Sequence, residues 1–174
     1  METPQPEPIV ISPQHPTVRL FIVCADAVLQ LPQTDDLQYA FWEIHNPYHT
    51  VWMPPGTIRN FGMYKLFVYA QLTDGLGTFN FGLKVEQVDL LNPKRTKVMG
   101  LVGPIQVTFD NPWDVIEEVV QFNNIPFPRP GQYLFSLIEN GKELPGGSTY
   151  LRVGERHICW WKFAHRKPVF RLKA

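Results

Sequence analysis

Several common features are scarce or missing in this sequence of 174 residues. Cysteine occurs only twice, at Cys24 and Cys159, which is too few for the disulfide framework of a small secreted domain. No Asn-x-Ser/Thr acceptor site occurs, and no apolar run approaches the roughly 20 residues that span a membrane. The first residues, METPQPEPIVISPQHP, lack the basic start and apolar run of a signal peptide. These absences predict a cytoplasmic protein without membrane association.

Charged residues are also scarce, at 18% of the chain, whereas aromatic residues reach 13% and proline occurs 17 times. Such a composition is typical of many short strands that end at prolines. The net charge of zero hides an asymmetry, because residues 1–154 carry 10 Lys and Arg against 15 Asp and Glu, while residues 155–174 carry six against one. We therefore divide the chain into a proline-rich lead-in (1–16), a body (17–154) and a basic aromatic C-terminal extension (155–174).

The pattern of apolar residues predicts about eight short strands in the body and no long helix. Val18–Val28 is a near-continuous apolar run, which predicts a strand buried on both faces, and Leu37–His45 is expected to form a second strand. Met63–Leu72 alternates between two kinds of position. The alternation places Leu66, Val68, Ala70 and Leu72 toward the core and turns Phe67 and Tyr69 outward.

A turn signal and a break in the pattern follow this third strand. Asp74-Gly75 lies between two alternating runs, which predicts a β-hairpin to a strand that points Phe79, Phe81, Leu83 and Val85 inward. The phase then slips, because the next apolar residues are Val88 and Leu90. One extra residue would restore the phase, so we expect a β-bulge near Glu86–Gln87.

The rest of the body continues this pattern. NPWDVIEEVVQF predicts at most one helical turn, because Asn111-Pro112 is a favourable helix start, followed by a strand from Val119 to Asn123. Asn140-Gly141 marks a tight turn, and STYLRV is the last strand. The residues expected to face the core are Ile105, Val107, Phe109, Tyr133, Phe135, Leu137, Leu151 and Val153.

Three motifs carry a family resemblance: VCADAV, LTDGLG and FPRPGQYLFSLIENG. In this order they resemble a bacterial family of small cytoplasmic proteins that is catalogued as a domain of unknown function. The resemblance covers about Val18 to Val153 and implies an all-β, antiparallel immunoglobulin-like sandwich, to which we add the C-terminal extension. Phe127, Pro130 and Gly131 match the family's entry to its penultimate strand, but no catalytic residues come with the match.

The same proline-glycine entry has a structural explanation. Proline prevents helix formation before the strand, and Gly131 permits a tight backbone entry. Tyr133 offers a hydroxyl that can bond back to the backbone, as tyrosines do at sandwich corners. The stretch is therefore interpreted as scaffold.

Catalytic chemistry finds little support in the sequence. TDGLG is flanked by strands and lacks the Lys-Ser/Thr pair of a phosphate loop. Cys24 lies inside an apolar run, where a thiolate is disfavoured, and Asp26 beside it is expected to be a structural carboxylate that accepts backbone N–H groups. No serine–histidine or paired-carboxylate set is present. We expect a protein that is not an enzyme and needs no cofactor.

The loop 46–56 offers the strongest alternative function. Tyr48 and Trp52, with Met53 and Pro54, could line a pocket for a sugar or a flat organic group beside His45 and His49. The two histidines alone are too few for zinc, which takes three or four protein ligands, so no metal site is predicted.

A protein-interaction or accessory module is the favoured function. The outward side chains Phe67, Tyr69, Leu134 and Ile138 exceed what a core needs, which is typical of an interface or of a surface covered by the chain itself. In the C-terminal extension Trp160, Trp161 and Phe163 are expected to dock on the sandwich or on a second subunit. The partner is thus a protein or another copy of the chain. Weak, unspecific nucleic-acid binding through the basic extension is the alternative.

Overall fold

The computed structural model describes residues 14–30, 41–53, 61–89 and 96–155, and every regular element in them is a β-strand. Within these residues no helix is long and apolar enough to cross a membrane. The prediction of an all-β protein is confirmed. The strands are β1 (Thr17–Gln30), β2 (Phe41–Pro47), β3 (Thr50–Met53), β4 (Phe61–Thr73), β5 (Gly77–Val88), β6 (Lys97–Phe109), β7 (Ile116–Phe127), β8 (Gly131–Glu139) and β9 (Lys142–Glu155).

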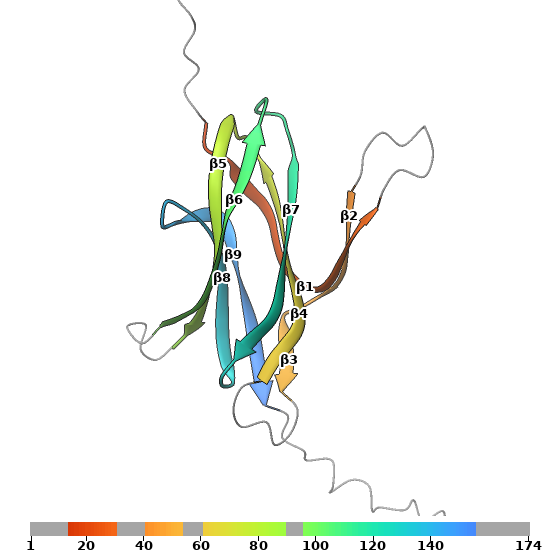
Figure 1. Cartoon of the computed structure of the whole chain (residues 1–174), viewed down its shortest axis with the longest axis vertical. Helices are drawn as coiled ribbons and strands as arrows, with labels where there is room; N and C mark the ends of the chain where they lie inside the picture. The colour runs from red at the N-terminus through yellow and green to blue at the C-terminus, as the bar shows by residue number, and fades with distance from the viewer. Residues whose placement is uncertain (1–13, 31–40, 54–60, 90–95, 156–174) are drawn as a thin grey trace, which may run out of the picture.

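The strands form two sheets that face each other (Figure 1). One sheet has four strands in the order β2-β1-β4-β7, and the other has five in the order β3-β9-β8-β5-β6. Two details of the prediction are wrong. The described chain has nine strands rather than about eight, because part of the expected loop 46–56 forms β3. The sheets are also not wholly antiparallel, since β3 pairs with β9 in parallel.

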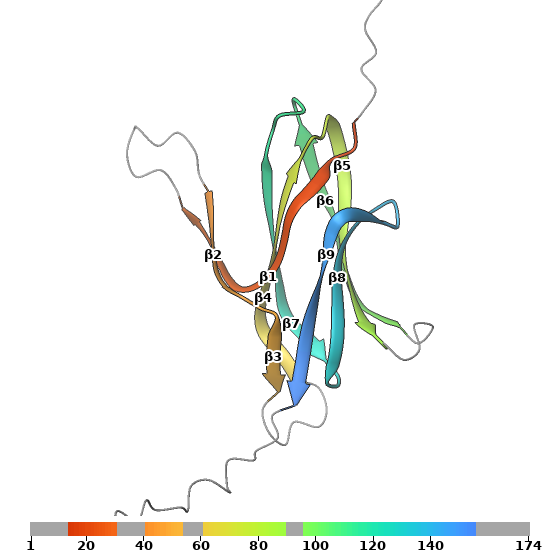
Figure 2. The same ribbon diagram turned by 180° about the vertical axis from the view of Figure 1, so that it is seen from behind.

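β1 is shared between two partners along its length. Its first half, Thr17 to Cys24, pairs with β4, and its second half, Cys24 to Gln30, pairs with β2. The sheet curls where the partners change, so the β1–β2 hairpin bends away from the two-sheet body (Figure 2). We call this hairpin the arm. The long apolar run is thus divided between the two-sheet body and the arm. It is not one strand buried on both faces throughout.

The Asp74-Gly75 turn does not close a hairpin, contrary to the prediction. β4 belongs to the four-stranded sheet and β5 to the five-stranded sheet, so the turn carries the chain from one sheet to the other. Asp74 has a φ of 63°, and a Cβ on Gly75 would lie 2.5 Å from the Phe109 ring. The same turn chemistry therefore serves a crossover, in which each strand buries its own apolar face against the opposite sheet.

The main hydrophobic core lies between the two sheets. Most residues predicted to face it are buried there, and Ile105 packs against it half-buried. Both sheets contribute large side chains that are almost completely inaccessible to solvent. They include Val23, Leu66, Val68 and Leu72 from the four-stranded sheet, and Phe81, Leu83, Phe109, Tyr133, Phe135 and Leu151 from the five-stranded sheet.

The β-bulge expected in β5 near Glu86–Gln87 is wrong in its position. β5 pairs with β8 without a break from Phe81 to Val88, and its alternation continues through the buried side chain of Gln87. The register shift at this point belongs to the ladder with β6, where Val85 pairs with Gly100 and Glu86 with Val98. The extra residue is therefore in β6, and a buried glutamine, rather than a bulge, accounts for the break in apolar pattern.

The segment before β7 is a tight turn rather than a helical turn. The Asp114 N–H donates to the Asn111 carbonyl at 3.2 Å, and the Trp113 N–H donates to the Asn111 side chain at 2.9 Å. β7 then begins at Ile116, three residues earlier than predicted, and includes Glu117 and Glu118. The strand can hold two carboxylates because neither side chain is fully buried.

Two predicted turns of the five-stranded sheet are confirmed. Asn140 and Gly141 both have positive φ angles, 49° and 77°, and connect β8 to β9 in a hairpin. At the start of β8 the Tyr133 hydroxyl donates to the Arg129 carbonyl at 2.7 Å, as expected of a sandwich corner. Its ring is fully buried against Phe127, so one residue fixes both the core and the preceding turn.

Candidate interaction surface

The aromatic segment does not form the predicted pocket wall. Tyr48 packs against the main core, and its N–H donates to the Val23 carbonyl at 2.7 Å. Met53 is buried, whereas Trp52 is 50% exposed and lies against Gly154 on the outside of the five-stranded sheet. The structure therefore brings Tyr48 and Trp52 to different sides of the sheet. Pro54 lies outside the described residues.

The two histidines of the alternative site are not joined by further ligands. His45 lies opposite Asp26 in the arm, with its Nε2 atom 3.5 Å from a Glu43 carboxylate oxygen. His49 is exposed in the turn before β3. Across the described parts of the chain no group of three or more His, Cys, Asp or Glu side chains is placed to hold a metal ion.

Cys24 is buried as predicted. Its side chain is completely inaccessible, with the sulfur 3.7 Å from the Phe67 carbonyl oxygen. Burial raises the pKa of the Cys24 thiol to about 11, so the thiolate needed by a nucleophile is scarce at neutral pH. Asp26 is exposed, and one of its oxygens accepts the Ala27 N–H at 3.0 Å. The pair acts as a small core residue and a local backbone acceptor.

Phe67 and Tyr69 do face away from the main core, but the chain covers them. Their side chains are only 5% and 3% exposed. They lie on the outer face of β4. Phe67 belongs to a second apolar cluster with Cys24, Ala27, Ile22, Trp42, Ile44 and Val119, so residues of the arm help to bury it. Tyr69 is buried beside it with its hydroxyl on Glu117. These two residues are therefore not available to a partner as the sequence predicted.

Glu117 ties the arm to the sheet beside this second cluster. Its carboxylate accepts the Tyr69 hydroxyl at 2.7 Å, the Gln71 amide at 3.3 Å and the Trp42 backbone N–H at 3.3 Å. Burial, together with the hydrogen bond to Glu117, raises the pKa of the Tyr69 hydroxyl. A tyrosine held so firmly in its neutral, donating form is suited to holding the arm rather than to proton transfer.

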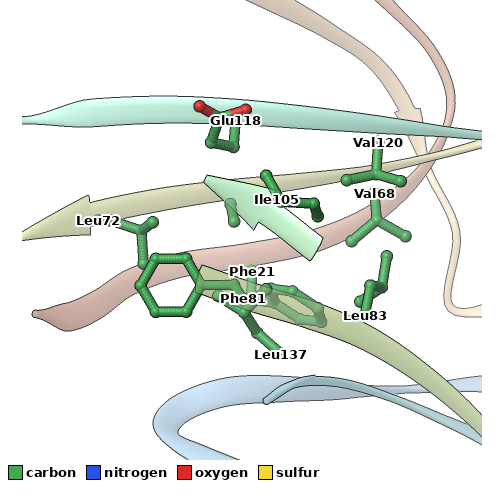
Figure 3. A pocket seen from close by; sticks show the side chains of 10 residues that line it. Phe21, Val68, Leu72, Phe81, Leu83, Ile105, Glu118, Val120 and Leu137 are labelled. Carbon is green, nitrogen blue, oxygen red and sulfur yellow. The ribbon is translucent and has the colours of Figure 1, made fainter. Parts of the chain in front are cut away.

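A small cavity lies between the sheets, and its lining includes Ile105 of β6 and Glu118 and Val120 of β7 (Figure 3). Its volume is about 10 Å³, which is room for a single water molecule. Glu118 is the only charged residue on a wall that is otherwise apolar, and burial raises the pKa of this carboxyl group. The lining includes no residue of the aromatic segment, and the space is too small for a sugar.

Exposed apolar side chains gather instead on the outer face of the five-stranded sheet. Trp52, Leu101 and Tyr150 are 50%, 65% and 53% exposed. Leu134 lies opposite Tyr150 across the β8–β9 ladder, and the Ile138 and Leu101 side chains both lie over Gly82. We call this outward-facing apolar set the outer band; its members are the exposed Trp52, Val98, Leu101 and Tyr150 and the half-buried Leu134 and Ile138.

Charge on the outer band is confined to a few positions. Lys84 and Glu86 form an ion pair at 3.0 Å in the middle of the face, and Glu86 lies opposite both Leu134 and Val98. The sequence pattern indicated that Leu134 and Ile138 are not needed by the core, and both lie on this face. The pattern missed Leu101 and Tyr150. Each is an apolar residue directly before an inward-facing residue of its strand, Val102 and Leu151 respectively, and that position indicates an outward side chain.

Trp160, Trp161 and Phe163 of the C-terminal extension lie outside the described residues, so their docking stays a prediction. No protein-family model matches the chain, and no curated protein matches it.

Proposed function

We propose that this protein is a non-enzymatic interaction module with an immunoglobulin-like sandwich, and that it binds a partner protein through the outer band. The strand order supports the immunoglobulin-like assignment: β1, β4 and β7 form one sheet, and β9, β8 and β5 the other, with a tyrosine corner at the entry to β8. The arm and β3 are additions to that arrangement.

The exposure of Trp52 and Tyr150 on one sheet face carries the functional proposal. Tryptophan and tyrosine are enriched among the residues that dominate binding energy at interfaces. Each is half-exposed, although neighbouring residues of the same strands, such as Met53 and Leu151, are buried in the core. Burial of these rings by a partner would remove a large apolar area from water.

The shape of the face favours a protein over a small ligand. A sheet surface offers a broad, shallow contact, whereas a small-molecule site needs a cavity that encloses its ligand. The Lys84–Glu86 ion pair and the exposed Arg152 supply polar groups amid the apolar ones, and protein interfaces commonly combine polar and apolar area. We therefore expect a partner with a complementary, mostly apolar face and few charges.

The test uses a photoreactive phenylalanine analogue at position 150 of the full chain in its native cells. We expect a cross-link to one protein species, lost on Trp52→Ala, and no such product from the analogue at Lys142 in the β8–β9 turn. With that protein purified, Trp52→Ala should weaken binding at least about tenfold, and Lys142→Ala should not change it. Equal cross-linking from both positions, or unchanged binding of Trp52→Ala, would overturn the proposal.

A further inference from the structure

β7 is the outermost strand of the four-stranded sheet, and among the described strands it pairs only with β4. Its other side therefore presents a row of backbone N–H and C=O groups that no described strand uses. Such a row is a template for the addition of another strand. Figure 1 shows this edge running along most of the body.

The other edges of the two sheets are shorter or irregular. β3 has four residues, and β2 lies in the curled arm. β6 contains Pro104, which lacks an N–H, and its ladder with β5 shifts register twice. β7, in contrast, keeps one register with β4 from Ile116 to Phe127. It is thus the longest regular edge of the described fold.

The middle of β7 also lacks the residues that usually guard an edge. Residues 119–125 read VVQFNNI, with no charge, no proline and no glycine. The exposed side chains here are amides, with the Gln121 amide nitrogen donating to the Asn123 amide oxygen at 2.7 Å. Charges occur only at the start of the strand, on Glu117 and Glu118.

We propose that β7 is a strand-addition site and that its partner is β7 of a second copy, paired antiparallel about a two-fold axis. The positions of the charged residues in β7 favour the antiparallel arrangement over the parallel one. In an antiparallel pair centred near Gln121, the Glu117–Glu118 end of one copy faces the Asn123 half of the other. A parallel pair in register would place the like charges opposite each other, which is unfavourable.

A second observation points to the same partner. Trp113 is 87% exposed and Val115 50% exposed, and both lie just before β7 on the turn held by Asn111 and Asp114. In the antiparallel pair this end of one copy lies beside the Pro126–Pro128 end of the other. Two Trp113 rings, one at each end of the paired strands, would then gain apolar neighbours that they lack within the described chain.

The interface so formed is modest in size. It consists of one strand ladder and two tryptophans, which places it toward the small end of specific protein interfaces. We therefore expect a dimer that dissociates on dilution, rather than an obligate one.

Sedimentation velocity of the full chain over a wide range of concentration tests the proposal. The wild type should show a monomer–dimer equilibrium, and Gln121→Lys should abolish the dimer because two lysines would then meet at the paired edges. Mixing Gln121→Lys with Gln121→Glu should restore it as a heterodimer. Trp113→Ala should weaken dimerisation at least about tenfold.

Two matched variants make the result specific. Gln106→Lys adds the same charge to the β6 edge and should leave the dimer intact. Trp52→Ala should also leave it intact, because the outer band belongs to the other sheet. A wild type that stays monomeric at every concentration, or a dimer that survives Gln121→Lys, would overturn the proposal. A dimer lost on Trp52→Ala would overturn it too and would assign self-association to the outer band.

Discussion

Cys24 and Tyr133 carry groups that act as nucleophiles or acids in other proteins, and burial removes that role from both. Cys24 is fully enclosed beneath the arm, and Tyr133 has its ring in the main core and its hydroxyl on the Arg129 carbonyl. Burial raises the pKa of each side chain, which keeps both neutral near pH 7. Both side chains therefore contribute packing, and the Tyr133 hydroxyl adds one hydrogen bond to the backbone.

Glu118 is the residue whose burial should be visible as a pH dependence of stability. Its pKa in the folded chain lies above the ordinary value of 4.5, because it lines the apolar cavity between the sheets. The folded state therefore prefers the protonated carboxyl. Stability from this preference is fully present below about pH 4.5 and is lost as the pH rises through the folded pKa.

Glu118→Gln removes the titrating carboxyl group and therefore tests this pH dependence of stability. In urea unfolding at pH 7 the variant should be more stable than the wild type, and the difference should shrink as the pH is lowered toward 4.5. Gln106→Asn, a change between two uncharged side chains at an exposed position, is the control and should not show this convergence. A stability gap that widens on acidification would show that Glu118 is not strained by burial.

At the scale of elements, the arm depends on its contacts with the four-stranded sheet. These are the second apolar cluster and the hydrogen bond that Glu117 accepts from the Trp42 N–H of β2. Glu117 also accepts hydrogen bonds from Tyr69 and Gln71 within the sheet. Removing the carboxylate would leave the buried Tyr69 hydroxyl without this acceptor.

Glu117→Ala should therefore loosen the arm while preserving the two-sheet body. Loss of a buried acceptor costs about 1–3 kcal/mol, and hydrogen exchange of the amides in residues 41–47 should become faster. Gln106→Ala, at an exposed position of β6, is the control for both measurements. Unchanged exchange in β2 would mean that the apolar cluster alone holds the arm.

The sequence predicts strands better than it predicts their partners. Alternation in Met63–Leu72 correctly separated the core-facing residues from Phe67 and Tyr69, because side-chain direction is a local property. Whether Asp74-Gly75 closes a hairpin or crosses between sheets depends on which distant strands cover each face. Local turn chemistry is the same in both cases.

The same limit applies to the candidate site. Phe67 and Leu134 show one pattern in sequence, an apolar residue on the side that the core does not need. The arm buries Phe67, whereas Leu134 stays half-buried on the outer face. The difference arises from the pairing of β2 with the far half of β1, which no pattern near Phe67 reports.

For the whole molecule, one core between two sheets implies that the body unfolds as a unit. Leu83→Ala removes a fully buried side chain from this core and should lower the free energy of unfolding by about 2–5 kcal/mol. Leu101→Ala changes the same residue type at a position 65% exposed and should shift it by less than about 0.5 kcal/mol.

Both variants should keep a single transition when unfolding is followed by fluorescence and by circular dichroism. Two separate transitions for Leu83→Ala would show that the sheets are not coupled through this core. In the binding measurement with the purified partner, Leu101→Ala should have the larger effect and Leu83→Ala the smaller one. The reason is that Leu101 lies in the outer band and Leu83 does not.

β1 begins at one end of the molecule, and β9 ends at the opposite end (Figure 1). A force that pulls Thr17 and Glu155 apart therefore acts along the strands rather than across them. β9 lies between β8 and the parallel strand β3, so to withdraw it the pull must slide it along two ladders at once. Hydrogen bonds sheared together resist more than bonds opened one after another. Pulled from these two ends, the body is expected to resist unfolding along the direction of its strands.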